Sequence, residues 1–575
     1  MPQVTVSVEL EPDLNNVLKP AAREALCQRL SGRADEILET LGIPGHASVE
    51  ITTGGTKQAS ADRLMRVAVN NRWCHYSNEL IQLVYSYMQG VPLGPAATAP
   101  EIFAWLGAGA DRERPIEFLS LVCLEIIKKH AGLLLAIPQA AAYLETLPPL
   151  TEESDSMAKT WPPDPDWLLP ILQAVLSLKL SIADKKTVAE VLRQGLGKNQ
   201  AKDEIVEDLI VAVRPNAVEV QISPEYLRQI TTATDDGEHN QFALMRDGLF
   251  YELGLRYPNF GFVAVESLKP CSFALKINHL TTTPRVGLAP KKLLVNDTVE
   301  RLKLLNIEAE AAINPANANK CAIINSAAKD LVESAAYQLT TWDQLGFLVL
   351  SFATELRMNS ASLIDRQVVQ DQLGQLEMAF PRLVEAAHRA VSVHQLTRVL
   401  RCLVAEEISI RNLRAILQSI IDYDYVVTDP LKYIVFDERL PLPRQPDEVR
   451  LRDPINMAAF VRSALKRYIS HKFTRGESSL VVYLLDAEIE KLLSRDHAVG
   501  SVGLNDHERD AILQSVRAEV GNTPRSAATS AILTTIDVRA ALRELIAAEF
   551  PRVPVLAYQE LSPDLNIQPI ARISL

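Results

Sequence analysis

The sequence lacks the features that mark membrane-spanning and disulfide-bonded secreted proteins. None of its 575 residues belongs to a run of about 18 apolar residues, and the longest apolar stretch, residues 131–144, is interrupted by Pro138. Its six cysteines are scattered without a C-x-x-C pair, a pattern typical of free thiols in a reducing compartment. The first residues alternate like a strand and lack the profile of a signal peptide. We therefore expect a soluble, cytoplasmic chain without direct membrane insertion.

The sequence also lacks the excess of basic residues typical of a nucleic-acid-binding protein. The net charge is −12, and the most basic stretch, residues 276–292, is interpreted as a solvated loop in preference to a binding patch. Hydrophobic residues make up 47% and charged residues 23% of the chain, as in ordinary globular proteins. A chain of this length predicts about three to five compact units.

Motifs that carry catalysis or bind cofactors are missing as well. There is no H-E-x-x-H, no G-x-S-x-G and no G-x-G-x-x-G after a strand. The nearest approach to a phosphate loop, GLGKNQ at 195–200, has Leu192 in place of its first glycine and Asn199 in place of its Ser or Thr. His388 and His394 do not have a zinc-ligand spacing. We expect no enzyme activity, no catalytic residue, no cofactor and no metal, with an unfamiliar active site as the remaining alternative.

What the sequence does contain is a long internal repeat. Leu41-Gly42 and Leu253-Gly254 lie 212 positions apart, and Ser181-Ile182 and Ser409-Ile410 lie 228 positions apart. Pro12 matches Pro224 before these pairs, and leucine positions between them match in the same order. The pattern predicts a duplication. We call residues 1–216 segment one and residues 217–478 segment two, and residues 479–575 have no counterpart.

Both segments predict the same succession of elements. A strand (4–10; 217–223) leads into a helix (23–42; 242–257), further strands follow (48–54 and 64–71; 262–267 and 271–278), and helices come next. The predicted class is an α+β and α/β protein of several subdomains. The predicted units are 1–146 (α+β and helical), 147–216 (linker and helix-turn-helix-like), 217–344 (α+β), 345–428 (helical and helix-turn-helix-like), 429–478 (connector and helix) and 479–575 (C-terminal α/β).

The stretch AEEISIRNLRAIL, residues 405–417, predicts the turn of the second helix-turn-helix-like unit. Either Ser409 or Asn412 is a candidate cap for the helix that follows. Glu406-Glu407 is interpreted as exposed charge at a helix end, in preference to a general acid–base pair. Arg411 and Arg414 share a helix face and could meet an acidic partner. The candidate partner-binding residues are Arg411, Asn412, Arg414, Asp537 and Arg539, and Asp537 is also expected to cap its helix.

The tail and three internal phrases resemble a known family. The tail contains DVR (537–539), FPRVPVLAY (550–558), Gln559-Glu560 and NIQP (566–569). The internal phrases are LMRDGLFYELGLRYPNF (244–260), LGQLEMAFPRLVEAA (373–387) and LTRVLRCLVAEEISIRNLRAIL (396–417). Together they resemble the cytoplasmic domain of the major export-gate proteins of type III secretion, the FlhA/LcrD/SctV (FHIPEP) family, closest to its injectisome branch. The resemblance covers residues 217–575 almost continuously.

The resemblance implies a non-enzymatic, four-subdomain module that assembles into a ring. Such modules receive chaperone–effector complexes, the gatekeeper and parts of the ATPase stalk. The chain departs from the family because segment one stands in place of the transmembrane half. The resemblance therefore predicts a docking component for chaperone–substrate complexes or the gatekeeper, associated with the membrane-bound export gate or the ATPase stalk. The alternative is a self-assembling ring or adaptor scaffold.

Overall fold

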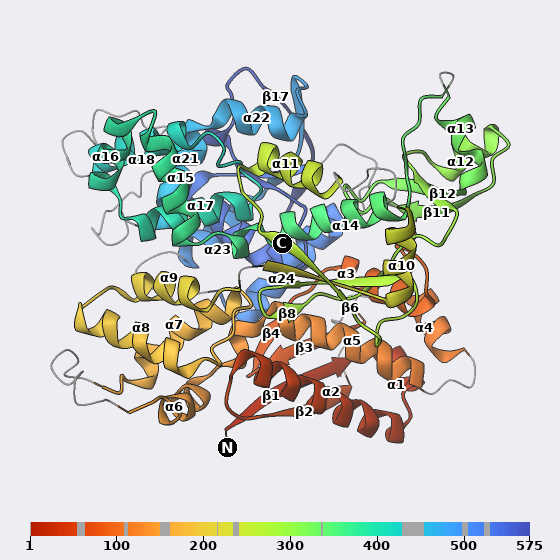
Figure 1. Ribbon diagram of the computed structural model, residues 1–575, viewed down its shortest axis with the longest axis horizontal. Helices are drawn as coiled ribbons and strands as arrows, with labels where there is room; N and C mark the ends of the chain where they lie inside the picture. The colour runs from red at the N-terminus through yellow and green to blue at the C-terminus, as the bar shows by residue number, and fades with distance from the viewer. Residues whose placement is uncertain are drawn as a thin grey trace. The chain divides into compact units, whose positions relative to one another are not determined.

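The computed structural model describes residues 2–53, 64–108, 113–149, 161–215, 217–233, 241–334, 337–427, 453–496, 504–521 and 530–575. Two compact units are formed, and Figure 1 labels their helices and strands. The first unit contains residues 1–247 and 257–362, and the second contains residues 248–256 and 363–575. The first unit thus holds segment one together with the strand-rich part of segment two.

Segment one begins with a four-stranded sheet in the order β2-β1-β3-β4. The central strand β1 (Gln3–Leu10) pairs in parallel with β2 (His46–Thr53) and antiparallel with β3 (Met65–Val69), and β4 (Arg72–Cys74) completes the sheet. Alternate residues of β1 are fully buried, as its apolar–polar alternation predicts. Helix α2 (Pro20–Leu41) packs against this sheet and α5 (Glu113–Lys129), as Figure 1 shows.

Segment two begins with a sheet of the same order and strand directions, β6-β5-β7-β8. Strand β5 (Ala217–Ile222) pairs in parallel with β6 (Asn259–Ala264) and antiparallel with β7 (Ser272–Ile277). Strands β8 (Leu280–Thr281) and β9 (Arg285–Val286) both pair with β7. The interpretation of residues 276–292 as a solvated loop was wrong, because these strands place Leu280 and Val286 in the core.

A third sheet follows in segment two, antiparallel and ordered β11-β12-β10-β13. Its strands are β10 (Lys292–Val295), β11 (Ala309–Ile313), β12 (Lys320–Asn325) and β13 (Thr341–Trp342). Strand β11 lies at an edge of this sheet. Besides α2 and α5, the first unit's helices are α1 (Pro12–Val17), α3 (Asn78–Gln89), α4 (Ala99–Gly107), α6 (Ile137–Glu145), α7 (Pro165–Ser177), α8 (Lys185–Gly197), α9 (Lys202–Val213), α10 (Pro224–Ala233), α12 (Val299–Leu304), α13 (Lys329–Val332) and α14 (Gln344–Met358).

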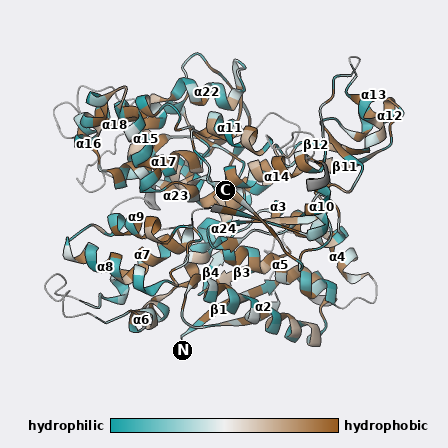
Figure 2. Ribbon diagram, in the orientation of Figure 1, coloured by the Kyte–Doolittle hydropathy of each residue, from teal (hydrophilic) through white to brown (hydrophobic). Residues whose placement is uncertain are grey.

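The second unit contains the predicted helix-turn-helix-like pair. Helix α17 (Val393–Ala405) and helix α18 (Leu413–Val427) flank the turn at residues 406–412. Figure 2 shows brown and teal residues along the same helices, as expected when one face of an amphipathic helix is buried. The other helices before the last sheet are the C-terminal part of α11 (Gln241–Leu253), α15 (Arg366–Glu377), α16 (Pro381–Ala390), α21 (Pro454–Ala464) and α22 (Lys466–Thr474). The predicted strand within residues 432–436 lies outside the described residues.

The C-terminal part is a parallel sheet ordered β16-β15-β14-β17, packed with α23 (Ala487–Asp496), α24 (Asp506–Val520) and α25 (Ile536–Ala547). Three of its strands, β14 (Ser479–Leu485), β15 (Ala531–Thr534) and β16 (Val555–Ala557), lie where the alternation of apolar strands and helices predicts them. The fourth, β17 (Asn566–Ile573), is a strand that the apolar pattern did not reveal, because most of its residues are not buried.

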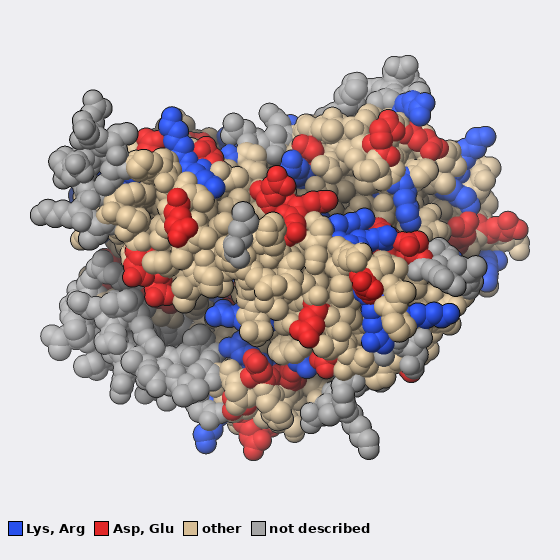
Figure 3. Space-filling model, turned by 90° about the horizontal axis from the view of Figure 1, so that it is seen from below, with Lys and Arg blue, Asp and Glu red and all other residues tan. Residues whose placement is uncertain are grey.

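The described residues were also compared with the requirements for a membrane-spanning helix and for a basic binding surface. No helix among them is both long and apolar enough to cross a bilayer. On the face shown in Figure 3, basic and acidic side chains are interspersed, without a continuous basic stripe.

Candidate functional site: an arginine–aromatic surface

The turn at residues 406–412 is held by a close approach to the end of α11. The Ile410 N–H donates to the Leu253 carbonyl at 2.9 Å. Gly254 follows in the left-handed region with φ +78°, and a Cβ on it would lie 2.3 Å from the Arg411 nitrogen. Only glycine fits this position without moving the turn. Backbone contacts with the end of α11 therefore fix the position of the turn.

Asn412 caps α18, because its Oδ1 accepts a hydrogen bond from the Ala415 N–H at 3.2 Å. This decides between the two candidate caps. Ser409 instead accepts from the Arg411 N–H within the turn.

Two arginines, Arg411 of this turn and Arg414 at the start of α18, lie over exposed aromatic rings. The Arg411 guanidinium carbon lies 4.7 Å from the ring centre of Tyr251, and that of Arg414 lies 4.8 Å from the ring centre of Phe380. Tyr251 is 62% exposed, Phe380 is 38% exposed, and Met378 beside it is 82% exposed. We call these residues, with Asn412, the arginine–aromatic surface. Arginine, aromatic residues and methionine are the types enriched at the centres of protein–protein interfaces.

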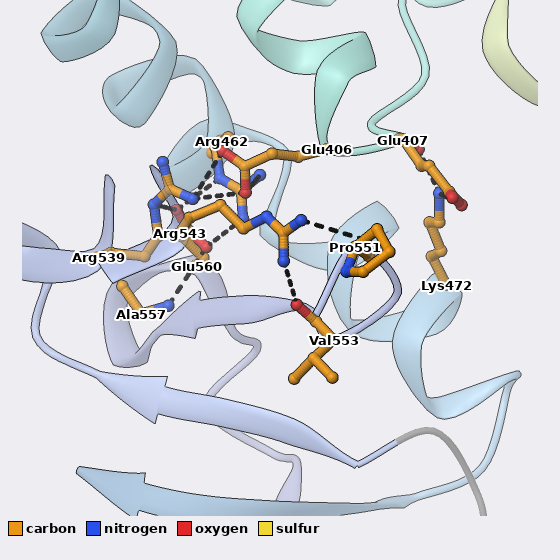
Figure 4. Close-up of polar contacts among 10 residues, drawn as sticks. All are labelled: Glu406, Glu407, Arg462, Lys472, Arg539, Arg543, Pro551, Val553, Ala557 and Glu560. Atoms are coloured by element: carbon orange, nitrogen blue, oxygen red, sulfur yellow. Dashed lines mark hydrogen bonds and ion pairs between the residues drawn. The ribbon is translucent and has the colours of Figure 1, made fainter. Parts of the chain in front are cut away.

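Directly before the turn, Glu406 enters a buried ion network, drawn in Figure 4. Its carboxylate receives the Arg539 Nη1 at 2.6 and 2.8 Å and the Arg462 Nη1 at 3.3 Å. Arg462 also donates two hydrogen bonds, of 2.6 and 2.7 Å, to Glu560. Arg462 is 1% exposed and Glu560 is 0% exposed. The interpretation of Glu406 as exposed charge was wrong.

The network fixes the protonation of Glu406. Burial alone would raise the pKa of this carboxyl, but the guanidinium groups of Arg462 and Arg539 outweigh burial and hold its pKa below the usual range. A carboxylate that stays ionised between two arginines is a poor general acid. The arrangement links α17, α21, α25 and the residues after β16 into one framework below the turn.

Glu407 and Ser409 on the other side of the turn are engaged by α22. The Lys472 ammonium donates to the Glu407 carbonyl and lies 3.7 Å from its carboxylate, and the Ser409 N–H donates to the Tyr468 hydroxyl at 3.2 Å. In segment one the corresponding groups meet the β7–β8 turn. There the His279 N–H donates to the Lys179 carbonyl at 3.1 Å, and the Ser181 N–H donates to the His279 Nδ1 at 3.0 Å.

The five residues predicted to bind a partner are thus placed differently. Arg411 and Asn412 end the turn, Arg414 follows in the first turn of α18, and all three are exposed. Asp537 is exposed at the start of α25, but it does not cap the helix, since the cap position belongs to Thr535. Arg539 is 3% exposed and committed to Glu406 and Glu560, so in this structure its side chain is not accessible to a partner.

The sequence analysis did not select the aromatic and methionine side chains of this surface. Tyr251, Met378 and Phe380 lie within phrases that carry the family resemblance, and that resemblance was the signal that could have identified them. No signal in the sequence identified Arg462, because its partners Glu406 and Glu560 lie 56 and 98 positions away. The positions matching Tyr251, Arg411 and Arg414 in segment one are Glu39, Ala183 and Lys186, so the surface is confined to segment two.

No cofactor site emerges from the described part of the chain. Within the residues that the structure describes, no group of three or more His, Cys, Asp or Glu side chains is arranged to hold a metal ion. Burial raises the pKa of the Cys74, Cys123 and Cys321 thiols to about 12, so these cysteines stay protonated and unreactive.

Several known proteins are similar to this chain in sequence. The low calcium response locus protein D of Yersinia pestis is 26% identical over 341 residues, which cover 59% of this chain and 45% of that protein. The flagellar biosynthesis protein FlhA of Bacillus subtilis is 23% identical over 406 residues, which cover 69% of this chain and 55% of that protein. The chain spans about half the length of these curated relatives.

Solved structures agree with the sequence relatives. The CdsV protein of Chlamydia pneumoniae is 29% identical, with a TM-score of 0.53 over 62% of this chain and 98% of that one. A complex of CdsV with CdsO from the same organism gives the same TM-score at 28% identity. The family model for the FHIPEP family matches residues 167–566, and this family consists of non-enzymatic transport components of type III secretion. The chain therefore belongs to the FHIPEP family of export-gate proteins, and its matched part corresponds to their cytoplasmic domain.

Proposed function

We propose that this protein is a cytoplasmic docking component of a type III secretion system that receives chaperone–substrate complexes or the gatekeeper on its arginine–aromatic surface. The observation that carries this proposal is the pairing of two exposed arginines with exposed aromatic rings on a rigid turn. Such pairs combine apolar area, fixed orientation and positive charge, which suits an amphipathic partner with acidic residues.

The buried network below the turn supports this role. A docking surface binds more tightly when it is ordered before the partner arrives, because less conformational entropy is lost on binding. Gly254, the Asn412 cap and the Glu406 network each order the turn without using the exposed side chains. Positive charge on a chain with net charge −12 also makes this surface distinct from its surroundings.

We further propose that segments one and two arose by duplication of one module. Helices α7 and α17 begin 228 positions apart, and so do α8 and α18. Gly42 and Gly254 share a left-handed backbone. A Cβ added to Gly42 would lie 2.4 Å from Ala183, and one added to Gly254 would lie 2.3 Å from Arg411, each in the turn of the same segment. The Ile182 N–H donates to Leu41 at 2.8 Å, as Ile410 does to Leu253. Chance similarity between two amphipathic folds does not require the same backbone contact at matching positions.

A stalk component of the secretion ATPase and a membrane-bound export gate are further candidate partners. The complex of the similar CdsV protein with CdsO supports a protein partner for this type of domain. A self-assembling ring or adaptor scaffold is the alternative function. Light scattering separates the two, since a strictly monomeric chain at high concentration would exclude the scaffold.

The docking function is tested by a pull-down with the immobilised full chain. We expect purified secretion chaperone–substrate complexes or gatekeeper to be enriched over an unrelated acidic protein of similar size. Equal recovery of these proteins and of the unrelated control would contradict the proposed function.

A further inference from the structure

Residues 87–94 of segment one lie against segment two. They comprise the last turn of α3 and the irregular chain after Gly90, with the sequence YMQGVPLG and no charged residue. We call them the 87–94 segment. Both they and the residues they touch belong to the first unit.

The 87–94 segment is bound through its own backbone carbonyls. The Lys269 ammonium donates to the Tyr87 carbonyl at 3.3 Å and to the Met88 carbonyl at 3.2 Å. The Ile313 N–H donates to the Leu93 carbonyl at 2.9 Å. Ile313 ends the edge strand β11, so this bond uses a donor that points away from the sheet. Backbone carbonyls are available on any peptide, so these contacts do not depend on a particular sequence.

Apolar side chains of the segment meet a hollow between several elements of segment two. Val91 and Leu93 line it from one side, together with residues of α3. Val286 of β9, Pro315 after β11 and Phe347 of α14 line it from the other side. The space left between these side chains is about 10 Å³, hardly enough for one water molecule. The 87–94 segment therefore fills the hollow almost completely, while Val91 stays 44% exposed to solvent.

We infer that the 87–94 segment is the tethered occupant of a peptide-docking groove formed by β9, α14 and the edge of β11. A partner protein carrying an uncharged, apolar peptide with a proline among its aliphatic residues would use the same groove once the segment leaves. The tether keeps the segment at a high effective concentration, so an outside peptide binds weakly until the segment is released. This groove is separate from the arginine–aromatic surface, and the inference holds or fails independently of the proposed function.

The test uses the full chain and a labelled peptide with the sequence of residues 86–96, SYMQGVPLGPA. Leu93→Asp places a carboxylate beside Val286, Pro315 and Phe347 and is expected to release the segment. Arg285, which also lines the hollow, is already paired with Glu355. Ile137→Asp is the matched control, since Ile137 is a 50% exposed apolar residue elsewhere in segment one. Amide hydrogen exchange at Ile313 reports release, and exchange in β12 reports whether the sheet itself stays folded.

We expect Leu93→Asp to accelerate exchange at Ile313 and to bind the labelled peptide at least about tenfold more tightly than the wild type, with Ile137→Asp unchanged. Lys269→Met is the second variant in case Leu93→Asp unfolds the sheet, because it removes only the donor to the Tyr87 and Met88 carbonyls. It should also accelerate exchange at Ile313 and tighten binding of the labelled peptide. Unchanged exchange at Ile313 in both variants would show that the segment is not detachable. Release without tighter peptide binding would show a structural strut in place of a groove. Either result overturns the inference.

Discussion

Replacing Glu406 by glutamine tests whether the buried ion network holds the docking turn. The substitution keeps the shape of the side chain and removes one negative charge. Arg539 donates to both oxygens of Glu406, and Arg462 donates to one of them. In the variant Glu560 is left as the one carboxylate among these four residues, facing two buried arginines.

The magnitude follows from the burial of the arginines. Breaking a buried ion pair by removing one partner typically destabilises a protein by 3–5 kcal/mol, since the other charge stays desolvated. Glutamine still offers one oxygen to a guanidinium group, and Glu560 still compensates Arg462. We therefore expect the free energy of unfolding of the second unit to fall by about 3 kcal/mol.

Hydrogen exchange of amides in α17, α21 and α25 measures this loss without assuming that the whole chain unfolds in one step. Glu407→Gln is the control, because Glu407 is 44% exposed and its ion pair with Lys472 contributes less than about 1 kcal/mol. The wild type should also lose this stability as the pH falls below about 4.5, because the pKa of Glu406 is depressed in the folded state. A loss in Glu406→Gln no larger than in Glu407→Gln would refute the reasoning.

Two further predictions concern the backbone of the turns and the pH response. Gly254→Ala and Gly42→Ala should each lower the free energy of unfolding by more than about 1 kcal/mol, whereas Gly374→Ala, with open space around its Cβ, should be neutral or slightly stabilising in denaturant titrations. Burial, and then Lys276, lowers the pKa of His279, so the unfolded state binds a proton more readily and stability should fall as the pH drops below about 6.5. His279→Asn, which keeps an acceptor for the Ser181 N–H, should remove part of that fall when unfolding is measured at pH 7.5 and 5.5; an identical pH dependence in the variant would argue against it.

Local pattern predicted strand β1 and helix α17, since the apolar alternation of β1 and the helical spacing of α17 each match a buried face. It did not predict the strands of the third sheet, β10–β13. Strand β17 escaped because its side chains are largely exposed, so its pairing with β14 leaves no apolar period. The repeated Leu-Gly pair marked Gly254 as a special position, but the spacing in the sequence did not predict that Gly254 contacts Arg411.

The site was predicted where its residues are adjacent in sequence and missed where they are distant. Arg411, Asn412 and Arg414 lie within four residues of one another, so one helix start brings them together. Tyr251 comes from α11, 160 positions earlier, and pairing of that kind depends on tertiary structure. Charge at a helix end favours exposure on average, but the Glu406 side chain is only 18% exposed, because Arg462 and Arg539 converge on it from elements that follow much later in the chain.

The docking proposal is tested most directly by the dissociation constant of the full chain for the chaperone–substrate complex recovered in the pull-down, measured by calorimetry. Removing two interface arginines that pack on aromatic rings should weaken binding by about 2–4 kcal/mol, so we expect Arg411→Ala/Arg414→Ala to lose at least about 30-fold in affinity. Lys185→Ala/Lys186→Ala, which removes the same charge from the matching helix of segment one, should bind like the wild type. Equal affinities for both double variants would contradict docking on the arginine–aromatic surface.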